Sequence, residues 1–334
     1  ATLQAHLGGA GLIGLHRAPR NLLEDPADIN LADIVKHMEG ALVRELMHRG
    51  DTAVLYGDSG AGKSFCAIDL GWHIATGKPW LGRKTRRAPV LYVALEGVFG
   101  FRRRLIAAQS KYGSAGGWFK RLTVSVTLVQ SEAGAEGART IIEACKQMQA
   151  QCGEPVGLIV IDTLSQSIAG MDENATEVMS GFIRERMGVL AEQTGACMLA
   201  VHHTNKQGQI RGSGTLYAAS DLVMRADYEK DDRNNRVGER RTLWAQKVKD
   251  GEEGLLCNYK LRRVPLGAYE DGREITSAVI DIDDTAELDS IVEEAFIRHW
   301  PEIQRGRFSP SFNSPTTSGA KILCNLEGEQ FFRP

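Results

Sequence analysis

One complete phosphate-binding sequence, G-x-x-x-x-G-K-S, constrains the fold of this chain more than any other feature. The apolar run at residues 53–56 before it is strand-like, and residues 65–75 after it have helical spacing. In a strand–loop–helix of this kind, glycine lets several backbone N–H groups converge on a phosphate above the helix N-terminus. The sequence therefore predicts nucleotide binding. The residues expected to contact the nucleotide are Gly57, Asp58, Ser59, Gly60, Ala61, Gly62, Lys63, Ser64 and Phe65.

Two residues at the end of this loop carry its predicted chemistry. Lys63 is expected to reach the β- and γ-phosphates as a point charge. The hydroxyl of Ser64 is expected to join the coordination shell of a Mg²⁺ ion that keeps most of its waters. A glycine-rich turn with a solvated lysine is the alternative interpretation. We therefore expect ATP and Mg²⁺ as cofactors.

Composition limits where other partners can bind. The chain has 334 residues, 43% of them hydrophobic, which is enough for a substantial core. Because the formal net charge is −2, any contact with nucleic acid must be local and cannot cover the whole exterior. The six cysteines form no C-x-x-C pair, so buried free thiols are expected and no zinc site is predicted. The sequence shows no membrane-spanning run and no signal pattern, which favours a cytoplasmic location.

The chain is predicted to have three parts. Residues 1–48 are expected to form an N-terminal arm and an amphipathic helix, and residues 49–285 the core. Residues 286–334 are expected to form a helix, at 288–300, and a Ser/Pro-rich tail. The amphipathic helix is placed at residues 31–47 by its apolar spacing. It could pack on a neighbouring subunit or cover its own sheet.

Strand-like and helix-like stretches alternate through the first part of the core. Strands are expected at residues 89–95, 122–129, 157–161 and 196–201, and helices at 138–151 and 175–193. Strands separated by helices predict a mostly parallel sheet covered on both faces. The later strands, at 222–228, 241–248, 255–264 and 277–281, are closely spaced and predict an antiparallel extension of the same sheet. The predicted fold class is therefore α/β.

Two carboxylates follow strands of the predicted sheet. Asp162 ends the apolar strand that begins at residue 157, and Glu96 ends the strand after the P-loop helix. At the carboxyl edge of a parallel sheet, Asp162 would face the phosphate-binding loop and hold the water shell of Mg²⁺. Glu96 would lie across from the γ-phosphate as a general base for water. A buried strand that ends in Asp at a turn, and a polar residue that opens a loop, are the alternative interpretations.

The strand at residues 196–201 delivers a pair of histidines to the same edge. A hydrogen-bond donor there can contact the γ-phosphate and transmit its loss to the next loop. Adjacent strand residues point to opposite faces, so His202 and His203 are poorly placed to share one metal ion. We therefore predict that His203 senses the γ-phosphate.

The order of these features resembles that of RecA-like motor ATPases, and most closely that of the RepA-type hexameric helicases of plasmids and phages, which are related to DnaB-type helicases. The resemblance spans about residues 50–265 and is carried by local stretches at 91–96, 161–164, 201–206, 211–216 and 219–223. It implies a RecA-like fold and a ring of six subunits. It also implies ATP at each subunit interface, with single-stranded DNA through the middle.

The resemblance also implies a positive group that reaches the neighbouring subunit's γ-phosphate. Where DnaB-like proteins have Lys-x-Arg, this chain has Lys247-Val248-Lys249. A lysine lacks the bidentate fork of arginine. Lys247 and Lys249 could act as point charges, Arg211, Arg225 or another arginine could replace them, or activation by the neighbour could be weak.

Two loops are expected to face the channel that the resemblance implies. The loop at residues 165–175 is acidic, whereas the loop at 206–214 is glycine-rich and carries Lys206 and Arg211. We predict that these two cations bind DNA phosphates, the alternative being an ordinary surface loop. The basic runs at 83–87 and 102–104 are interpreted as solvated charge or interface residues.

These features predict an ATP-dependent DNA helicase or translocase that forms a homo-oligomer. A recombination or annealing mediator of RecA/RadA type, which would form filaments, is a second hypothesis. An accessory regulatory ATPase that binds partner proteins is a third.

Overall fold

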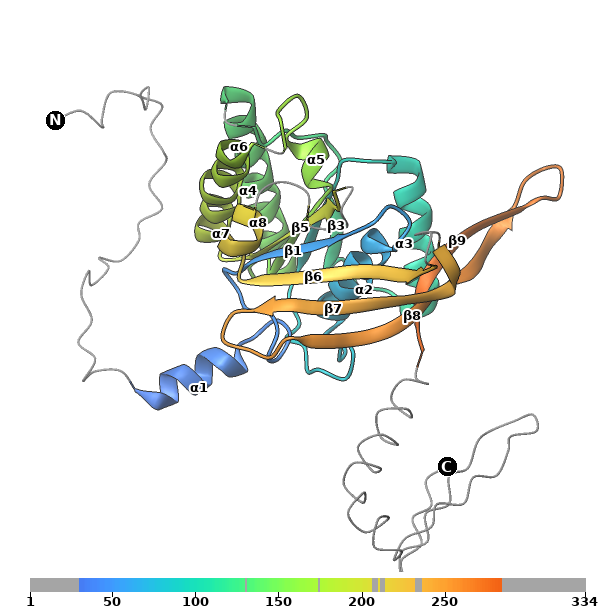
Figure 1. Ribbon diagram of the computed structural model, residues 1–334, viewed down its shortest axis with the longest axis horizontal. Helices are drawn as coiled ribbons and strands as arrows, with labels where there is room; N and C mark the ends of the chain where they lie inside the picture. The colour runs from blue at the N-terminus through green and yellow to red at the C-terminus, as the bar shows by residue number, and fades with distance from the viewer. Residues whose placement is uncertain are drawn as a thin grey trace, which may run out of the picture.

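A single twisted sheet of nine strands organises the structure, a computed structural model that describes residues 30–129, 131–173, 175–205, 210, 214–231 and 236–283 (Figure 1). The strand order is β3-β2-β4-β5-β1-β6-β7-β8-β9. The strands are β1 Thr52–Gly57, β2 Val90–Ala94, β3 Phe119–Arg121, β4 Leu158–Asp162, β5 Cys197–His203, β6 Leu222–Lys230, β7 Arg236–Val248, β8 Gly254–Ala268 and β9 Glu274–Ile282.

The sheet has a parallel and an antiparallel part, as the sequence predicts. Strands β3 to β6 in the spatial order are parallel, and β1 lies between β5 and β6. Strands β6, β7, β8 and β9 are antiparallel. The fold is therefore an α/β fold with a parallel core and an antiparallel extension. Because β1, β2, β4 and β5 are parallel, their carboxyl ends meet at one edge.

Helices cover both faces of the parallel part. The helices are α1 Leu31–Glu39, α2 Lys63–Thr76, α3 Val98–Tyr112, α4 Glu132–Cys152, α5 Leu164–Ser167, α6 Thr176–Gly181, the π-helix η2 Phe182–Gly188, α7 Val189–Thr194 and α8 Gly214–Ala219. Helices α2 and α3 lie on one side of the sheet, and α4 to α8 lie on the other (Figure 1).

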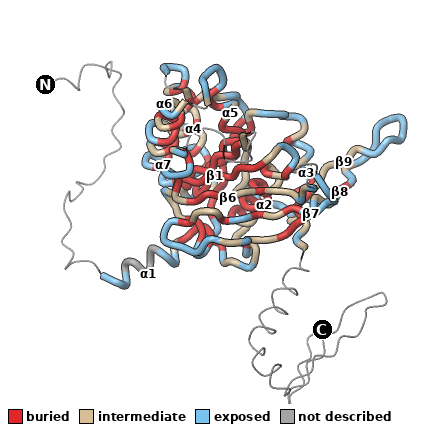
Figure 2. Tube along the Cα trace, in the orientation of Figure 1, coloured by how far each residue is buried: buried red, intermediate tan, exposed pale blue. Residues whose placement is uncertain are grey.

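The two larger hydrophobic cores of the described structure lie on opposite faces of the sheet, because alternate residues of each strand point to opposite faces. In β1, Ala53 and Leu55 pack toward α2 and α3, whereas Val54 and Tyr56 pack toward α4 to α8. Both faces are covered, so β1, β2 and β4 are buried along their whole length and almost entirely apolar. Buried residues concentrate in the sheet, and the tip of the β8–β9 hairpin is exposed (Figure 2).

The predicted helix at residues 31–47 is wrong in its second half, because α1 ends at Glu39. The chain then folds back, and Val43 pairs with Thr85 in an isolated bridge. This path buries Leu42 and Val43 in the core beside α2, which a continuing helix would have kept away from the sheet. Leu31, Val35 and Met38 of α1 are exposed, so these three side chains do not cover the sheet.

The predicted strand at residues 122–129 is also wrong. The edge strand is the short β3, which pairs with β2 and ends at Arg121. Leu122 and Leu128 are buried and produce the strand-like pattern, but Leu128 N–H donates to the carbonyl of Ser167 instead of a strand. An apolar pattern cannot distinguish a paired strand from a loop anchored at both ends.

Other boundaries differ by smaller amounts. Helix α4 begins earlier than predicted, at Glu132, because Ser131 caps it by accepting a hydrogen bond from Gly134 N–H. The predicted helix at 175–193 corresponds to α6, η2 and α7 in succession. The predicted helix at 288–300, the tail and most of the N-terminal arm lie outside the described residues.

Within the described part of the chain, no helix is long and apolar enough to cross a membrane. The five cysteines there, Cys66, Cys145, Cys152, Cys197 and Cys257, are all free thiols. This agrees with the scattered pattern of cysteines in the sequence.

Candidate active site

The phosphate-binding loop joins β1 to α2 at the carboxyl edge of the sheet. Its first glycine, Gly57, is required by a close approach, since a Cβ there would lie 2.0 Å from the carbonyl oxygen of Ala226 on β6. Gly62 has φ +98°, a conformation that L side chains rarely adopt. Helix α2 begins at Lys63, directly after this glycine, so its N-terminal N–H groups open onto the loop. The loop therefore has the backbone of an anion site.

Lys63, the first residue of α2, is buried against the loop. Its Nζ donates hydrogen bonds to the carbonyl oxygens of Gly57, at 2.8 Å, and Asp58, at 2.9 Å, and lies 3.4 Å from His203 Nδ1. Burial lowers the pKa of Lys63, although the nearby carboxylates, first that of Asp162, favour the charged form. The amine of Lys63 thus lies between the loop and the end of β5.

Asp162 lies at the end of β4, buried beside the loop. Its Oδ2 accepts a hydrogen bond from the hydroxyl of Tyr92 at 2.6 Å, and its carboxylate also accepts one from the hydroxyl of Ser64. Burial raises the pKa of Asp162, while these two hydrogen bonds favour its ionised form. The two residues predicted to serve Mg²⁺, Ser64 and Asp162, are therefore in contact.

This pair of oxygen ligands fits Mg²⁺ in a nucleotide site. The described residues contain no group of three or more His, Cys, Asp or Glu side chains that could hold a metal ion. Mg²⁺ requires few protein ligands when phosphates and waters supply the others, and it prefers oxygen. Ser64 and Asp162 are consistent with that requirement.

Glu96 follows β2 and faces the end of β4. The Leu95 N–H donates to the carbonyl of Asp162 at 2.7 Å, which fixes the two strand ends together. The hydroxyl of Thr163 donates to Glu96 Oε1 at 2.6 Å, and this threonine also caps α5. Glu96 is exposed and influences both Lys63 and Asp162 electrostatically. It has a fixed carboxylate that is open to water, as a general base requires.

The two histidines of β5 point in opposite directions. His203 lies near Lys63, on the side of the phosphate-binding loop. His202 is completely buried, with its Nδ1 3.5 Å from Ser165 Oγ at the start of α5. The structure brings Lys63, Glu96, Asp162 and His203 to one edge of the sheet. The sensing role of His203 remains a prediction.

Asp58 links the phosphate-binding loop to β5 and β6 at this edge. The sequence did not predict these contacts. The Asp58 carboxylate accepts hydrogen bonds from Thr204, directly after β5, and from Lys230 at the end of β6, where the Nζ–Oδ2 distance is 2.5 Å. Burial favours the neutral acid, but the bonds from Lys230 and Thr204 outweigh it and hold the pKa of Asp58 below its ordinary value. Asp58 is one of the variable positions of the loop motif, so no sequence signal marks it.

We predict that Lys230→Met lowers the free energy of unfolding at neutral pH by no more than about 1 kcal/mol and makes it less dependent on pH. A carboxylate with a depressed folded pKa stabilises the protein above its unfolded pKa, and that stabilisation is lost as pH falls through the folded pKa. Without Lys230, Asp58 contributes less, so the loss below about pH 4 is smaller. Denaturant unfolding across this pH range measures the difference. Lys260→Met, which removes the ion pair between the exposed Lys260 and Asp283, is the control. Parallel curves for wild type and Lys230→Met would contradict the prediction.

Arg104 is a second residue whose position the sequence did not reveal. Its guanidinium lies 4.9 Å from the centre of the Phe65 ring, and its charge partly opposes the rise in the pKa of Asp162 that burial causes. The sequence predicts solvated or interface charge for the basic run at 102–104, whereas Arg104 lies beside Phe65, next to the phosphate-binding loop.

The cations predicted to act on a neighbouring subunit lie far from their own phosphate-binding loop. Lys247 Nζ donates to the carbonyls of Tyr217 and Ala218, and Lys249 Nζ lies 3.1 Å from Asp221 Oδ1. Strand β7 runs antiparallel to β6, so its end lies at the amino edge of the parallel sheet. These lysines therefore cannot reach the nucleotide of their own subunit.

Three other candidates for contacts with a neighbour or with DNA have different outcomes. Lys206 and Arg211 lie outside the described residues. Arg225, on β6, pairs with Asp227 at 2.6 Å within its own strand. Their roles remain predictions.

The loop, the buried lysine and the strand-end carboxylates together form the site of a P-loop ATPase. Residues 29–209, more than half of the chain, match the AAA_25 family, described as an AAA domain. The chain therefore belongs to this family. A comparison with curated proteins found no match.

Solved structures with similar folds share little sequence with this chain. A KaiC-like protein from the hyperthermophilic archaeon Pyrococcus horikoshii OT3 superposes with a TM-score of 0.46 and 16% identity, over 72% of this chain and 93% of that one. The ATPase domain of G40P superposes with a TM-score of 0.49 and 14% identity, over 69% of this chain and 92% of that one.

Proposed function

We propose that this ATPase is a DNA helicase or translocase of RepA type that hydrolyses ATP to move on single-stranded DNA in plasmid or phage replication. The observation that carries the proposal is the link between the phosphate-binding loop and the segment that follows β5. Thr204 hydrogen-bonds to Asp58 and pairs with Ile210 in an isolated bridge. The start of the segment predicted to bind DNA, and Ile210 within it, are thereby linked to the nucleotide site.

The hydrolytic step follows from the geometry at the sheet edge. Lys63 would stabilise negative charge on the β- and γ-phosphates, with the loop N–H groups beside it. Glu96, held by Thr163, would accept the proton of the attacking water. Ser64 and Asp162 would hold Mg²⁺, which neutralises phosphate charge when bound.

Loss of the γ-phosphate would be transmitted through β5. His203 lies on the loop side of this strand, and Thr204 follows it directly. A change in the contact between His203 and phosphate would shift Thr204 and the base of the segment at 205–210. Lys206 and Arg211 of the loop at 206–214 would then bind and release DNA phosphates.

A homo-oligomer completes this proposal. Lys247 and Lys249 lie at the sheet edge opposite their own nucleotide site, so a contact with γ-phosphate requires a second copy of the chain. We propose a hexamer, located in the cytoplasm, with ATP at the subunit interfaces. Electron micrographs with a non-hydrolysable ATP analogue and single-stranded DNA test this. Closed rings with six-fold symmetry support the proposal, whereas filaments support a RecA/RadA-like mediator and monomers an accessory ATPase.

We predict that the double variant Lys206→Ala, Arg211→Ala weakens binding to a labelled oligo(dT) and flattens its salt dependence. Each phosphate contact on single-stranded DNA contributes about 0.7 to the slope of log K against log salt, so losing two lowers the slope by roughly 1.4. Fluorescence anisotropy at several salt concentrations, with an ATP analogue present, measures both quantities.

The matched control removes the same amount of positive charge elsewhere. Lys84→Ala, Arg86→Ala changes two exposed residues that precede β2, at the amino edge of the parallel sheet. This control should retain DNA affinity and slope. If the variant of Lys206 and Arg211 also retains both, the segment at 206–214 does not bind DNA.

A further inference from the structure

Two buried side chains of the antiparallel extension reach the phosphate-binding loop. Arg241 on β7 and Tyr259 on β8 are paired directly across the two strands and are 4% and 0% exposed. The Tyr259 hydroxyl donates to the carbonyl oxygen of Ala61 at 2.6 Å. Arg241 Nε lies 3.5 Å from the carbonyl oxygen of Gly60, and its Nη1 donates to the carbonyl of Glu239. These residues are about 180 to 200 positions from the loop in sequence.

The pair also packs directly on the backbone of the loop. A Cβ added at Gly62 would lie 3.2 Å from the Tyr259 hydroxyl oxygen and 3.7 Å from Arg241 Cδ. Gly62 thus satisfies two requirements, a positive φ and the space that these side chains occupy. The antiparallel extension therefore packs directly against the phosphate-binding loop.

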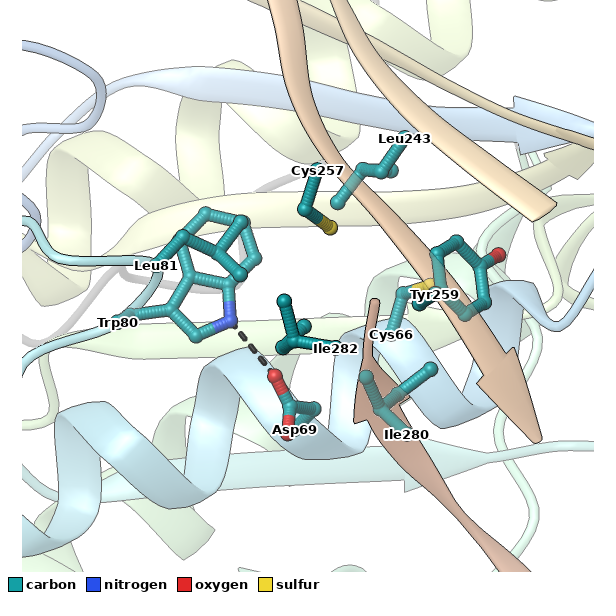
Figure 3. Close-up of a pocket in the computed structure, with 9 residues that line it drawn as sticks. All are labelled: Cys66, Asp69, Trp80, Leu81, Leu243, Cys257, Tyr259, Ile280 and Ile282. Carbon is teal, nitrogen blue, oxygen red and sulfur yellow. Dashed lines mark hydrogen bonds between the residues drawn. The ribbon is translucent and has the colours of Figure 1, made fainter. Parts of the chain in front are cut away.

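A small pocket behind the loop shows how Tyr259 is held. Tyr259 and Cys66 lie together on one side of it, and Trp80 lies on the other, where its indole Nε1 donates to Asp69 at 2.8 Å (Figure 3). The Tyr259 hydroxyl also hydrogen-bonds with Cys66, two residues after Ser64. Burial raises the pKa of Tyr259 and raises that of Cys66 to about 12, so both groups stay neutral and Tyr259 keeps its donor proton.

The direction of one loop peptide follows from this bond. A peptide unit is planar and trans, so the carbonyl of Ala61 and the N–H of Gly62 point in opposite directions. Because Tyr259 holds the carbonyl on one side, the Gly62 N–H is directed to the other side, away from the extension. A phosphate bound by the loop requires N–H groups held in this way.

We propose that Tyr259, supported by Arg241, is a positioning residue that holds the Ala61–Gly62 peptide of the phosphate-binding loop with its N–H toward the nucleotide. The antiparallel extension also carries Lys247 and Lys249. Tyr259 would therefore act on the nucleotide site of its own subunit, and the two lysines on that of a neighbouring subunit. The proposal depends on nucleotide binding in the proposed function and is independent of DNA.

The variant Tyr259→Phe removes only the hydroxyl. The Kd for ATP and the KM are expected to rise roughly 3- to 10-fold, the effect of one lost hydrogen bond, because the loop must be ordered by the nucleotide itself. The kcat is expected to change little, since Glu96 and Asp162 are untouched. Binding of fluorescent ATP and steady-state phosphate release give this split between KM and kcat.

Tyr112→Phe is the matched control. The Tyr112 hydroxyl donates to the Asp69 carboxylate, on the same helix as Lys63 but away from the loop. Tyr112→Phe therefore also removes a partly buried hydrogen bond to α2, but this variant should leave the Kd for ATP and the KM unchanged. An equal rise in both variants, or none in Tyr259→Phe, would overturn the positioning role.

Two further outcomes remain informative. Wild-type protein that binds no ATP would refute the nucleotide site itself, and wild-type protein that hydrolyses ATP without DNA stimulation would refute only the DNA proposal.

If Tyr259→Phe does not fold, Arg241→Met provides the test, because it removes the guanidinium and keeps an aliphatic chain beside Gly62. An unchanged Kd in that folded variant would also overturn the proposal.

Discussion

Glu96→Gln is expected to lower the kcat of ATP hydrolysis by about 10²- to 10⁴-fold while ATP still binds, which is the usual contribution of a general base. The amide keeps the size and a hydrogen-bond acceptor for Thr163, but it cannot take a proton from water. None of its contacts holds the phosphate-binding loop, so the Kd should change little. Phosphate release and fluorescent ATP binding measure the two quantities separately.

A matched carboxylate elsewhere controls for the loss of charge. Glu132→Gln makes the same chemical change at an exposed residue of α4, which pairs only with Arg139 in the described structure, and it should retain full activity. Thr163→Val leaves Glu96 ionised but removes the hydroxyl that orients it, so an intermediate loss of kcat is expected. Full turnover in Glu96→Gln would show that another group activates water.

Lys63→Met is expected to reduce kcat by at least about 10²- to 10³-fold and to weaken ATP binding. Methionine fills most of the buried space of the lysine but brings no charge to the phosphates. The variant also leaves the carbonyls of Gly57 and Asp58 without their hydrogen bonds from the amine. Titration with fluorescent ATP and steady-state kinetics test both effects.

Lys111→Met separates this effect from general damage. Lys111 on α3 is half-buried, and its Nζ donates to the carbonyl of Ile280, away from the phosphate-binding loop. Burial lowers the pKa of Lys111, as it does that of Lys63. Equal losses of ATP affinity in the two variants would contradict a direct role for Lys63.

Several parts of the fold could be predicted because their signals are local. The phosphate-binding loop is a continuous motif, and apolar runs identify β1, β2, β4 and β5 within a few residues. Parallel strands place their carboxyl ends together, so the meeting of Glu96, Asp162 and His203 follows from strand ends alone. The predictions were wrong where apolar residues are buried in segments that form no regular helix or strand, as at residues 41–47 and 122–129.

The sequence by itself determined that this chain has a phosphate-binding loop on a mostly parallel sheet, with its candidate catalytic groups at the ends of the strands. Only the tertiary structure decided which side chains hold that loop. Thr204 and Lys230 donate hydrogen bonds to the Asp58 carboxylate, and the Tyr259 hydroxyl donates one to the carbonyl of Ala61. Those partners are 146 to 198 residues away along the chain. No periodicity or motif encodes such contacts, because they arise when separate strands are brought side by side in one sheet.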